Sequence, residues 1–187
     1  MFGAHMVFSQ RVVGLERSGD RRVVHLADGH QVAARAVIVA TGIAWRRLGV
    51  PRLEALVGSG VFYGAAGAEA RAMAGQDVFV VGAGNSAGQT ALHLARYARH
   101  VTMLVRGDSL ARTMSDYLIQ EIDATAGITV CLRTEITDGH GSEQLEALTL
   151  CDRGRGRTIT VPATALFVLI GGEPRTQWLA GALQLER

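Results

Sequence analysis

The segment of this sequence best suited to chemistry is the run Val78–Ala87, in which an apolar stretch leads directly into the pattern Gly-x-Gly-x-x-Ala. In this pattern Gly82 allows a tight turn, and Gly84 lets the main chain approach a diphosphate without a Cβ in the way. Ala87 keeps the following helix close to the strand, so that the first helical amides face the anion with the positive end of the dipole. The spacing predicts a dinucleotide site, with a glycine-rich turn that binds nothing as the alternative. Its expected residues are Gly82, Gly84, Asn85, Ser86 and Ala87.

The residues after the next apolar run, His100–Val105, indicate which dinucleotide is preferred. NAD enzymes usually place an acidic residue there, about 20 residues past the glycines, to bind the ribose hydroxyls. This sequence instead has Arg106, with Arg112 close behind, and a guanidinium group suits a 2′-phosphate. NADPH is therefore the expected cofactor, unless Arg106 is an ordinary solvated surface residue. Asp108 follows two residues later, and we expect it to cap the loop or to pair with an arginine.

The elements that must position these residues alternate between strand and helix patterns. Strands are predicted at Asp77–Val81, His100–Val105, Thr129–Thr134 and Ala165–Ile170, and helices at Ser86–Ala98 and Ser115–Ala124. A β-meander is expected from Ile136 to Val161, with turns at 138–141 and 153–156. This order predicts an α/β fold with a doubly wound parallel sheet, a Rossmann-like three-layer ββα domain.

The first forty residues are predicted to be β-rich. Strands are expected at Met6–Gln10, Arg11–Glu16, Arg22–Leu26 and Gln31–Ala33, with a hairpin turn at Asp28-Gly29. The run Ala36–Ala40 is apolar on both faces, which predicts a buried strand of the parallel type.

The composition excludes several classes of function. All 19 basic residues are arginine, so a Schiff-base lysine, a Walker-A loop and a Tyr-x-x-x-Lys dyad are impossible. A formal net charge of +2 gives no indication of nucleic acid or of an anionic membrane. Cys131 and Cys151 lack metal or disulfide spacing and fit buried thiols in a reducing cytoplasm, and the histidines show no metal-binding spacing either.

Several ordered motifs together resemble the low-molecular-weight thioredoxin reductases, flavoproteins with two dinucleotide-binding domains. The matching segments are Val39–Gly42, Gly60–Tyr63, Gly82–Ala87, Leu104–Asp108 and Phe167–Thr176. The resemblance implies that Ala40, Thr41 and Gly42 lie against FAD, and that Ile170 and Gly171 join the NADPH site. It also implies hydride transfer from NADPH to the flavin, for which the cofactors carry the chemistry and no catalytic side chain is nominated.

The sequence departs from the family pattern at the redox-active segment. Gly64 and Gly67 stand where the family has the two cysteines of Cys-x-x-Cys, so the usual dithiol relay to thioredoxin is not expected. The electron acceptor is left open by this departure. In the 2′-phosphate region Val105 and Gly107 replace the family's His and second Arg, so that only Arg106 is carried over directly.

The resemblance also implies a domain organisation. Residues 1–42 are expected to form the end of a first FAD-domain segment, 43–163 the NADPH-binding domain, and 164–187 the start of the returning FAD segment, so the chain is expected to be a fragment. The expected function is the NADPH-binding part of a thioredoxin reductase-like flavoenzyme. A non-catalytic NADP(H)-binding regulatory or sensing module is the alternative, and the oligomeric state, a homodimer included, is left open.

Overall fold

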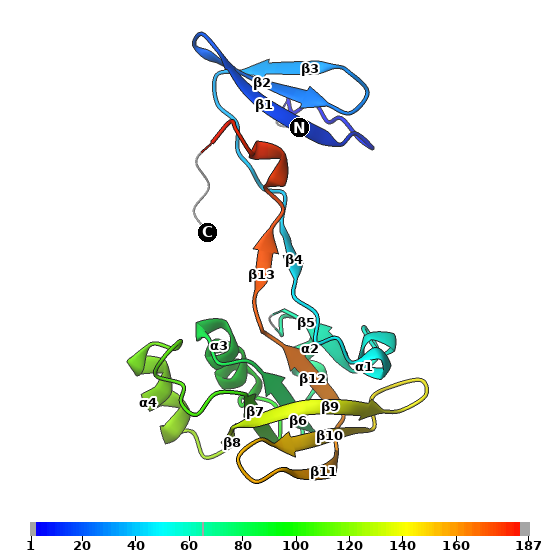
Figure 1. The fold of residues 1–187 in the computed structure, drawn as a ribbon, viewed down its shortest axis with the longest axis vertical. Coiled ribbons are helices and arrows are strands. Elements are labelled where there is room, and N and C mark those ends of the chain that lie inside the picture. The colour runs from blue at the N-terminus through cyan, green and yellow to red at the C-terminus, as the bar shows by residue number, and fades with distance from the viewer. Residues whose placement is uncertain (1–2, 65, 184–187) are drawn as a thin grey trace. The chain divides into compact units, whose positions relative to one another are not determined.

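A computed structural model describes residues 3–64 and 66–183 (Figure 1). The chain divides into two compact units: one contains the described parts of 1–44 and 172–187, and the other is Trp45–Gly171. The expected assignment of 1–42, 43–163 and 164–187 to FAD-binding and NADPH-binding domains stays a prediction, because the two units are defined by packing and not by ligands.

The larger unit is built on a five-stranded parallel sheet. Its strands are β5 (Val61–Tyr63), β6 (Asp77–Val81), β7 (His100–Val105), β8 (Ile128–Leu132) and β12 (Ala165–Val168), in the spatial order β5-β12-β6-β7-β8. The register runs unbroken from Asp77 opposite His100 to Val81 opposite Leu104, so that β6 and β7 end at the same edge. The predicted parallel sheet of a Rossmann-like α/β domain is confirmed, whereas helices on both of its faces, as in a doubly wound fold, are replaced by the arrangement that follows.

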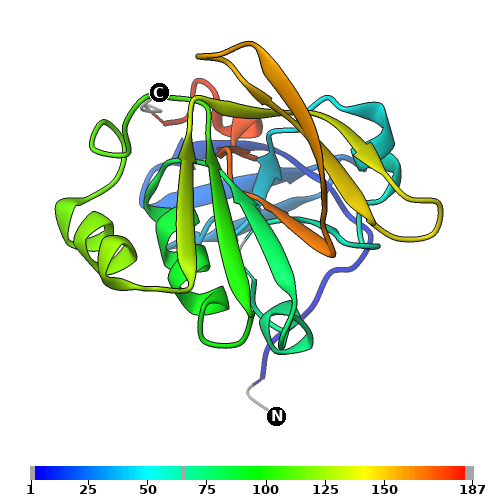
Figure 2. The ribbon, with the colours of Figure 1, turned by 90° about the horizontal axis from the view of Figure 1, so that it is seen from below.

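Helices cover one face of this sheet and a meander covers the other (Figures 1 and 2). The helices are α3 (Asn85–Leu94) and α4 (Asp116–Ala124), and the meander consists of β9 (Thr134–His140), β10 (Ala147–Asp152) and β11 (Arg157–Pro162). Since side chains of a strand alternate between faces, Val78 and Val80 pack with the helices, whereas Phe79 packs with the meander. The two resulting cores hold the three ββα layers together.

Two short helices complete the larger unit. The helix α1 (Pro51–Ala55) begins at a proline, which suits the first turn because its missing N–H has no helical partner there. It buries Leu53 in the meander-side core, and α2 (Glu69–Ala72) buries Ala70 in the helix-side core. Among the described residues, no helix has the length and apolar character needed to cross a membrane.

The smaller unit contains an antiparallel sheet of β1 (Val12–Ser18), β2 (Arg21–Leu26) and β3 (Gln31–Ala34). A two-stranded sheet pairs β4 (Ile43–Trp45) with β13 (Gly172–Pro174), and a 3-10 helix, η1, spans Gln177–Leu179. The hairpin predicted at Asp28-Gly29 is confirmed, since Gly29 adopts a φ of 88° and the Asp28 side chain accepts from the His30 amide.

Several sequence predictions were wrong in detail. Ala36–Ala40 is not a buried strand: it pairs with none of the described strands, and Ile38 is 93% exposed. Met6–Gln10 is likewise irregular and exposed. An apolar run forms a strand only where a neighbouring main chain completes its ladder. The helix predicted over Ser86–Ala98 ends at Leu94, and the turn expected at 138–141 lies beyond His140 because β9 continues that far.

Candidate nucleotide-binding site at the carboxyl edge of the parallel sheet

The strand order reverses between β6 and β12, because the chain proceeds from β6 through β7 to β8 and then returns to the other side of β6. Ligands of open α/β sheets bind in the crevice at such a switch point, outside the carboxyl ends of the strands. The Leu169 amide donates to the Val81 carbonyl (2.9 Å), and the Gly82 amide donates to Leu104 (3.2 Å). The fold therefore brings the predicted residues after β6 beside Ile170 and Gly171.

Gly82 is required by the protein's own packing. Its φ is 145°, a backbone conformation that side chains other than hydrogen disfavour. A Cβ at this position would collide with the carbonyl oxygen of Leu169 and lie 3.1 Å from the Ala87 Cβ. Gly82 and Ala87 together let β6, β12 and α3 approach closely. The sequence pattern predicted the close approach of the helix to β6 but not that of β12.

Gly84 is not required by packing. Its φ of −90° and ψ of 175° suit any residue, and an added Cβ would meet only the Thr113 carbonyl oxygen, at 3.9 Å. Space that a Cβ would fill, beside a helix N-terminus, is what a diphosphate needs in order to approach the main chain. The residues of this turn thus fit a dinucleotide.

The helix α3 begins with two unused amide donors. The amides of Ala87 and Gly88 donate to the Gly84 carbonyl (3.0 and 3.2 Å), whereas no described residue accepts from the amides of Asn85 and Ser86. Both residues are exposed, and the first turn of α3 carries no acidic side chain. The helix dipole is consequently unopposed at its positive end, which favours an anion there.

The Asn85 side chain ties the turn to α4. Its Oδ1 accepts from the Ser115 amide (2.8 Å), and its Nδ2 donates to the Ser115 hydroxyl (3.0 Å). A second tie joins Thr113 Oγ1 to the Ala83 carbonyl (2.7 Å). The side chain of Asn85 therefore stabilises the turn, and the main-chain N–H of Asn85 is the group that can donate to a ligand. Sequence analysis missed Thr113 and Ser115 as site residues. Serine at the first position of the predicted helix over 115–124 suggests an N-cap, but the Ser115 side chain forms no capping hydrogen bond and pairs with Asn85 instead.

Arg106 and Arg112 both lie on the segment that follows β7. They are exposed, and neither forms an ion pair with any described residue. The Gly107 carbonyl, next to Arg106, accepts from the Arg133 amide (2.8 Å), which fixes the main chain of this loop. The loop that carries the two arginines is tied to the turn before α3 through Thr113, whose hydroxyl donates to the Ala83 carbonyl.

The expectation for Asp108 was wrong. Its carboxylate makes neither a capping hydrogen bond nor an ion pair within the described ranges. The loop is capped instead by Ser109, whose hydroxyl accepts from the Ala111 amide (3.1 Å). A serine one position later is favoured because its short side chain reaches the main chain two residues on.

On the other side of the crevice, Tyr63 ends β5 within a polar cluster. Its hydroxyl donates to Glu54 (2.5 Å) and accepts from the Leu48 amide (3.0 Å), while the Arg47 guanidinium lies 4.6 Å from the ring centroid. Burial, followed by the hydrogen bond to Glu54, raises the pKa of Tyr63 above its ordinary value. The cluster holds the loop before α1 against β5.

Gly64 and Gly67, at the predicted redox position, carry no thiol. Gly64 is buried and follows β5, and Gly67 is exposed. The cysteines lie elsewhere: Cys131 on β8 and Cys151 on β10 are free, and both are partly buried. Burial raises the pKa of the Cys131 thiol, which disfavours the reactive thiolate.

The residues expected at FAD, Ala40, Thr41 and Gly42, lie in the smaller unit. All three are exposed. The Thr41 hydroxyl donates to the Arg175 carbonyl (2.7 Å), and the Gly42 carbonyl accepts from the Arg175 amide (3.0 Å). The structure therefore places them against the returning segment, and their contact with FAD stays a prediction.

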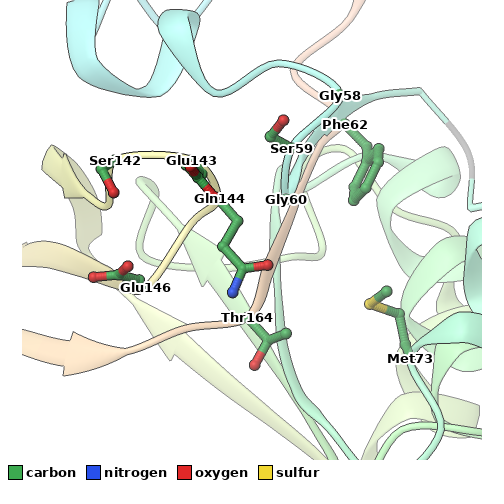
Figure 3. Close-up of a pocket in the computed structure, with 10 residues that line it drawn as sticks. All are labelled: Gly58, Ser59, Gly60, Phe62, Met73, Ser142, Glu143, Gln144, Glu146 and Thr164. Atoms are coloured by element: carbon green, nitrogen blue, oxygen red, sulfur yellow. The ribbon is translucent and has the colours of Figure 1, made fainter.

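A hollow of about 560 Å³ opens at the opposite edge of the sheet, before β5 and β12 (Figure 3). Phe62 and Met73 form its apolar side, and its charged residues are Glu143 and Glu146. Two carboxylates repel a diphosphate, which disfavours this hollow as a site for a nucleotide. A smaller one, about 180 Å³, lies along α3 and includes Ser86.

Comparison with known proteins shows the family and the fold of this chain. A family model described as pyridine nucleotide-disulphide oxidoreductase matches residues 3–187. Among solved structures, a thioredoxin reductase from Giardia duodenalis superposes with a TM-score of 0.80 at 24% identity, over 94% of this chain and 56% of that one, which shows the shared fold. A thioredoxin reductase from Streptococcus pyogenes superposes with a TM-score of 0.77 at 27% identity, over 91% and 55%.

Sequence relatives point the same way. The chain is 37% identical over 187 residues to a thioredoxin reductase of Streptomyces clavuligerus, covering 99% of this chain and 56% of that protein. It is 30% identical over 178 residues to an NADH dehydrogenase of Bacillus subtilis, covering 95% and 34%. The chain thus spans about half the length of the thioredoxin reductases that it matches. The resemblance found from the motifs is confirmed, and the chain belongs to the pyridine nucleotide-disulphide oxidoreductase family.

Proposed function

We propose that the unit Trp45–Gly171 binds NADPH at the switch point between β6 and β12. The diphosphate accepts hydrogen bonds from the amides of Asn85 and Ser86, and Gly84 leaves room for it. Support comes from the two unused amides and from the open space at Gly84, which the protein's own packing does not explain. Gly82 and Ala87 shape the turn, and Ile170 and Gly171 form the facing wall.

The preference for NADPH over NADH is assigned to Arg106 and Arg112. A 2′-phosphate next to a guanidinium gains a charge-assisted hydrogen bond that a ribose hydroxyl cannot match. The exposure of both arginines and their freedom from ion pairs among the described residues support this role.

For a protein of the relatives' full length, we propose an FAD-dependent oxidoreductase of the cytoplasm. Ala40, Thr41 and Gly42 would contribute to holding FAD, which when bound would supply the hydride-accepting chemistry. The residues of the present chain bind and orient the nucleotide, and none of them is assigned a proton-transfer step. Support comes from the family to which the chain belongs.

Electrons are proposed to reach their acceptor without passing through a dithiol. Because Gly64 and Gly67 have no sulfur, no disulfide can form at that segment. Electrons would leave the flavin for another protein, a quinone-like molecule or oxygen. This separates the chain from the reaction that the names of its thioredoxin reductase relatives describe.

Titration with NADPH tests the proposal. The amide NMR signals of Asn85 and Ser86 should shift, and Gly84→Val should abolish binding while the thermal unfolding midpoint stays close to that of the parent. Unmoved amide signals, or undiminished affinity in Gly84→Val, would place the nucleotide elsewhere. A full-length protein that binds NADPH but shows no flavin absorbance would instead be the regulatory or sensing module.

A further inference from the structure

The indole ring of Trp45 lies directly over Gly64. A Cβ at position 64 would come within 2.8 Å of Cζ2, 3.3 Å of Cε2 and 3.4 Å of Cη2 of that ring. Gly64 also has a φ of 98°, so any other residue would be strained there. The residue that stands in place of a family cysteine is therefore matched to a tryptophan that fills the space of its side chain.

This pair lies at the carboxyl edge of the sheet. The Gly64 amide donates to Val168 at the end of β12 (3.1 Å). The amide of Arg46, the neighbour of Trp45, donates to the Gly171 carbonyl (3.0 Å). Trp45 thus lies beside the ends of β5 and β12, across the switch point from Arg106.

Packing against Gly64 covers only part of the Trp45 indole ring. Trp45 is 40% exposed, and its N–H has no hydrogen-bond partner in the described part of the chain. The other tryptophan, Trp178, donates its N–H to the Arg175 carbonyl (3.2 Å). A partly exposed indole face beside a candidate nucleotide site offers a surface on which a flat ring can stack.

Trp45 is also at a suitable place for one end of the nucleotide. A dinucleotide lies across the switch point, with its two halves on opposite sides. If the adenosine end lies toward Arg106 beyond β7, the nicotinamide end extends over β12 and β5. Neighbouring strands are about 4.8 Å apart, so β5 lies roughly 10 Å from β6, within reach of a nicotinamide ribose.

We propose that Trp45 is a positioning residue that stacks on the nicotinamide ring of NADP(H), and that Gly64 is glycine so that the indole can lie there. This inference rests on the proposed NADPH site. The electron-rich indole attracts the positively charged ring of NADP⁺ more strongly than the neutral ring of NADPH. Replacement of the thiol by glycine and the presence of Trp45 then form one arrangement, in which an aromatic surface replaces a redox group.

The test compares ligands with and without the nicotinamide ring. Dissociation constants for NADP⁺, NADPH and 2′-phospho-ADP-ribose, which lacks the ring, are measured by calorimetry for the parent protein, Trp45→Ala, Trp45→Phe and the control Trp178→Phe. Stacking of this kind contributes enough that Trp45→Ala should weaken NADP⁺ binding by roughly three- to tenfold. Binding of 2′-phospho-ADP-ribose should stay unchanged, and Trp45→Phe should fall between parent and Trp45→Ala.

A spectroscopic measurement gives an independent readout. NADP⁺ stacked on an indole should produce a charge-transfer absorbance that is present in the parent and in Trp178→Phe and absent from Trp45→Ala. Equal weakening of all three ligands, or unchanged NADP⁺ affinity in Trp45→Ala, would overturn the role of Trp45 alone. Failure of the parent protein to bind any of the three would overturn the proposed NADPH site and this inference with it.

Discussion

Gly82 and Leu169 approach so closely that residue 82 has no room for a side chain: a Cβ there would collide with the Leu169 carbonyl oxygen. The contact joins the ends of β6 and β12, the two strands between which the strand order reverses. Gly82 is thus required both by the phosphate-loop pattern and by the close approach of the two strands.

Gly82→Ala is expected to lower the free energy of unfolding by about 2–4 kcal/mol, because it adds both a collision and backbone strain at a φ of 145°. Urea unfolding followed by circular dichroism measures this. Gly84→Ala is the matched control and should change stability by less than about 1 kcal/mol, since its backbone is already in an ordinary conformation. Similar losses for both variants would contradict the distinction between a packing glycine and a ligand glycine.

Arg106→Ala is expected to weaken NADPH binding by roughly ten- to a hundredfold, the value of a hydrogen bond to a charged group, and to change NADH binding much less. Isothermal titration with both nucleotides gives the ratio. Arg157→Ala, which removes an exposed arginine of the meander, is the control for net charge and should leave the ratio unchanged. Equal losses of NADPH and NADH affinity would remove Arg106 from the phosphate-binding role.

Restoring a cysteine at position 64 is expected to destabilise the protein. Gly64→Cys should lower the free energy of unfolding by roughly 1–3 kcal/mol, because φ is positive and Trp45 occupies the space. Gly67→Cys should be close to neutral, since a Cβ at 67 would meet nothing within 4 Å. In the double variant Gly64→Cys/Trp45→Ala the two effects should not add, because they share one contact. Strict additivity in chemical denaturation would mean that Trp45 and residue 64 do not compete for space.

Tyr63 is expected to make stability depend on pH at high pH. Its raised pKa means that the fold favours the neutral phenol, so this stabilisation is complete below the ordinary tyrosine pKa of about 10 and is lost as the pH rises through the higher folded value. The unfolding free energy of the parent should therefore fall more steeply above pH about 10 than that of Tyr63→Phe. At neutral pH Tyr63→Phe should be about 1 kcal/mol less stable, because Glu54 and the Leu48 amide lose a partner. Parallel pH profiles for the two proteins would count against the Tyr63 cluster as the cause.

The sequence by itself determined the elements whose signals are local. The strand–glycine–helix pattern at Val78–Ala87 and the Asp28-Gly29 hairpin were both predictable, because turn geometry and side-chain periodicity are set by neighbouring residues. It also determined that no dithiol can form at Gly64 and Gly67, and that the first charged residue after β7 is Arg106.

Only the tertiary structure decided what depends on neighbours distant in sequence. Ala36–Ala40 has the composition of a buried strand but lies exposed, because burial needs a partner that no local pattern can supply. The hydrogen bonds of the Asn85 side chain to Ser115 join residues that are 30 positions apart in the sequence. The packing of the Trp45 ring over Gly64 joins residues that are 19 positions apart. Packing in three dimensions determines such pairs. For the same reason only the structure distinguishes Gly82, which the fold requires, from Gly84, whose open space fits a ligand.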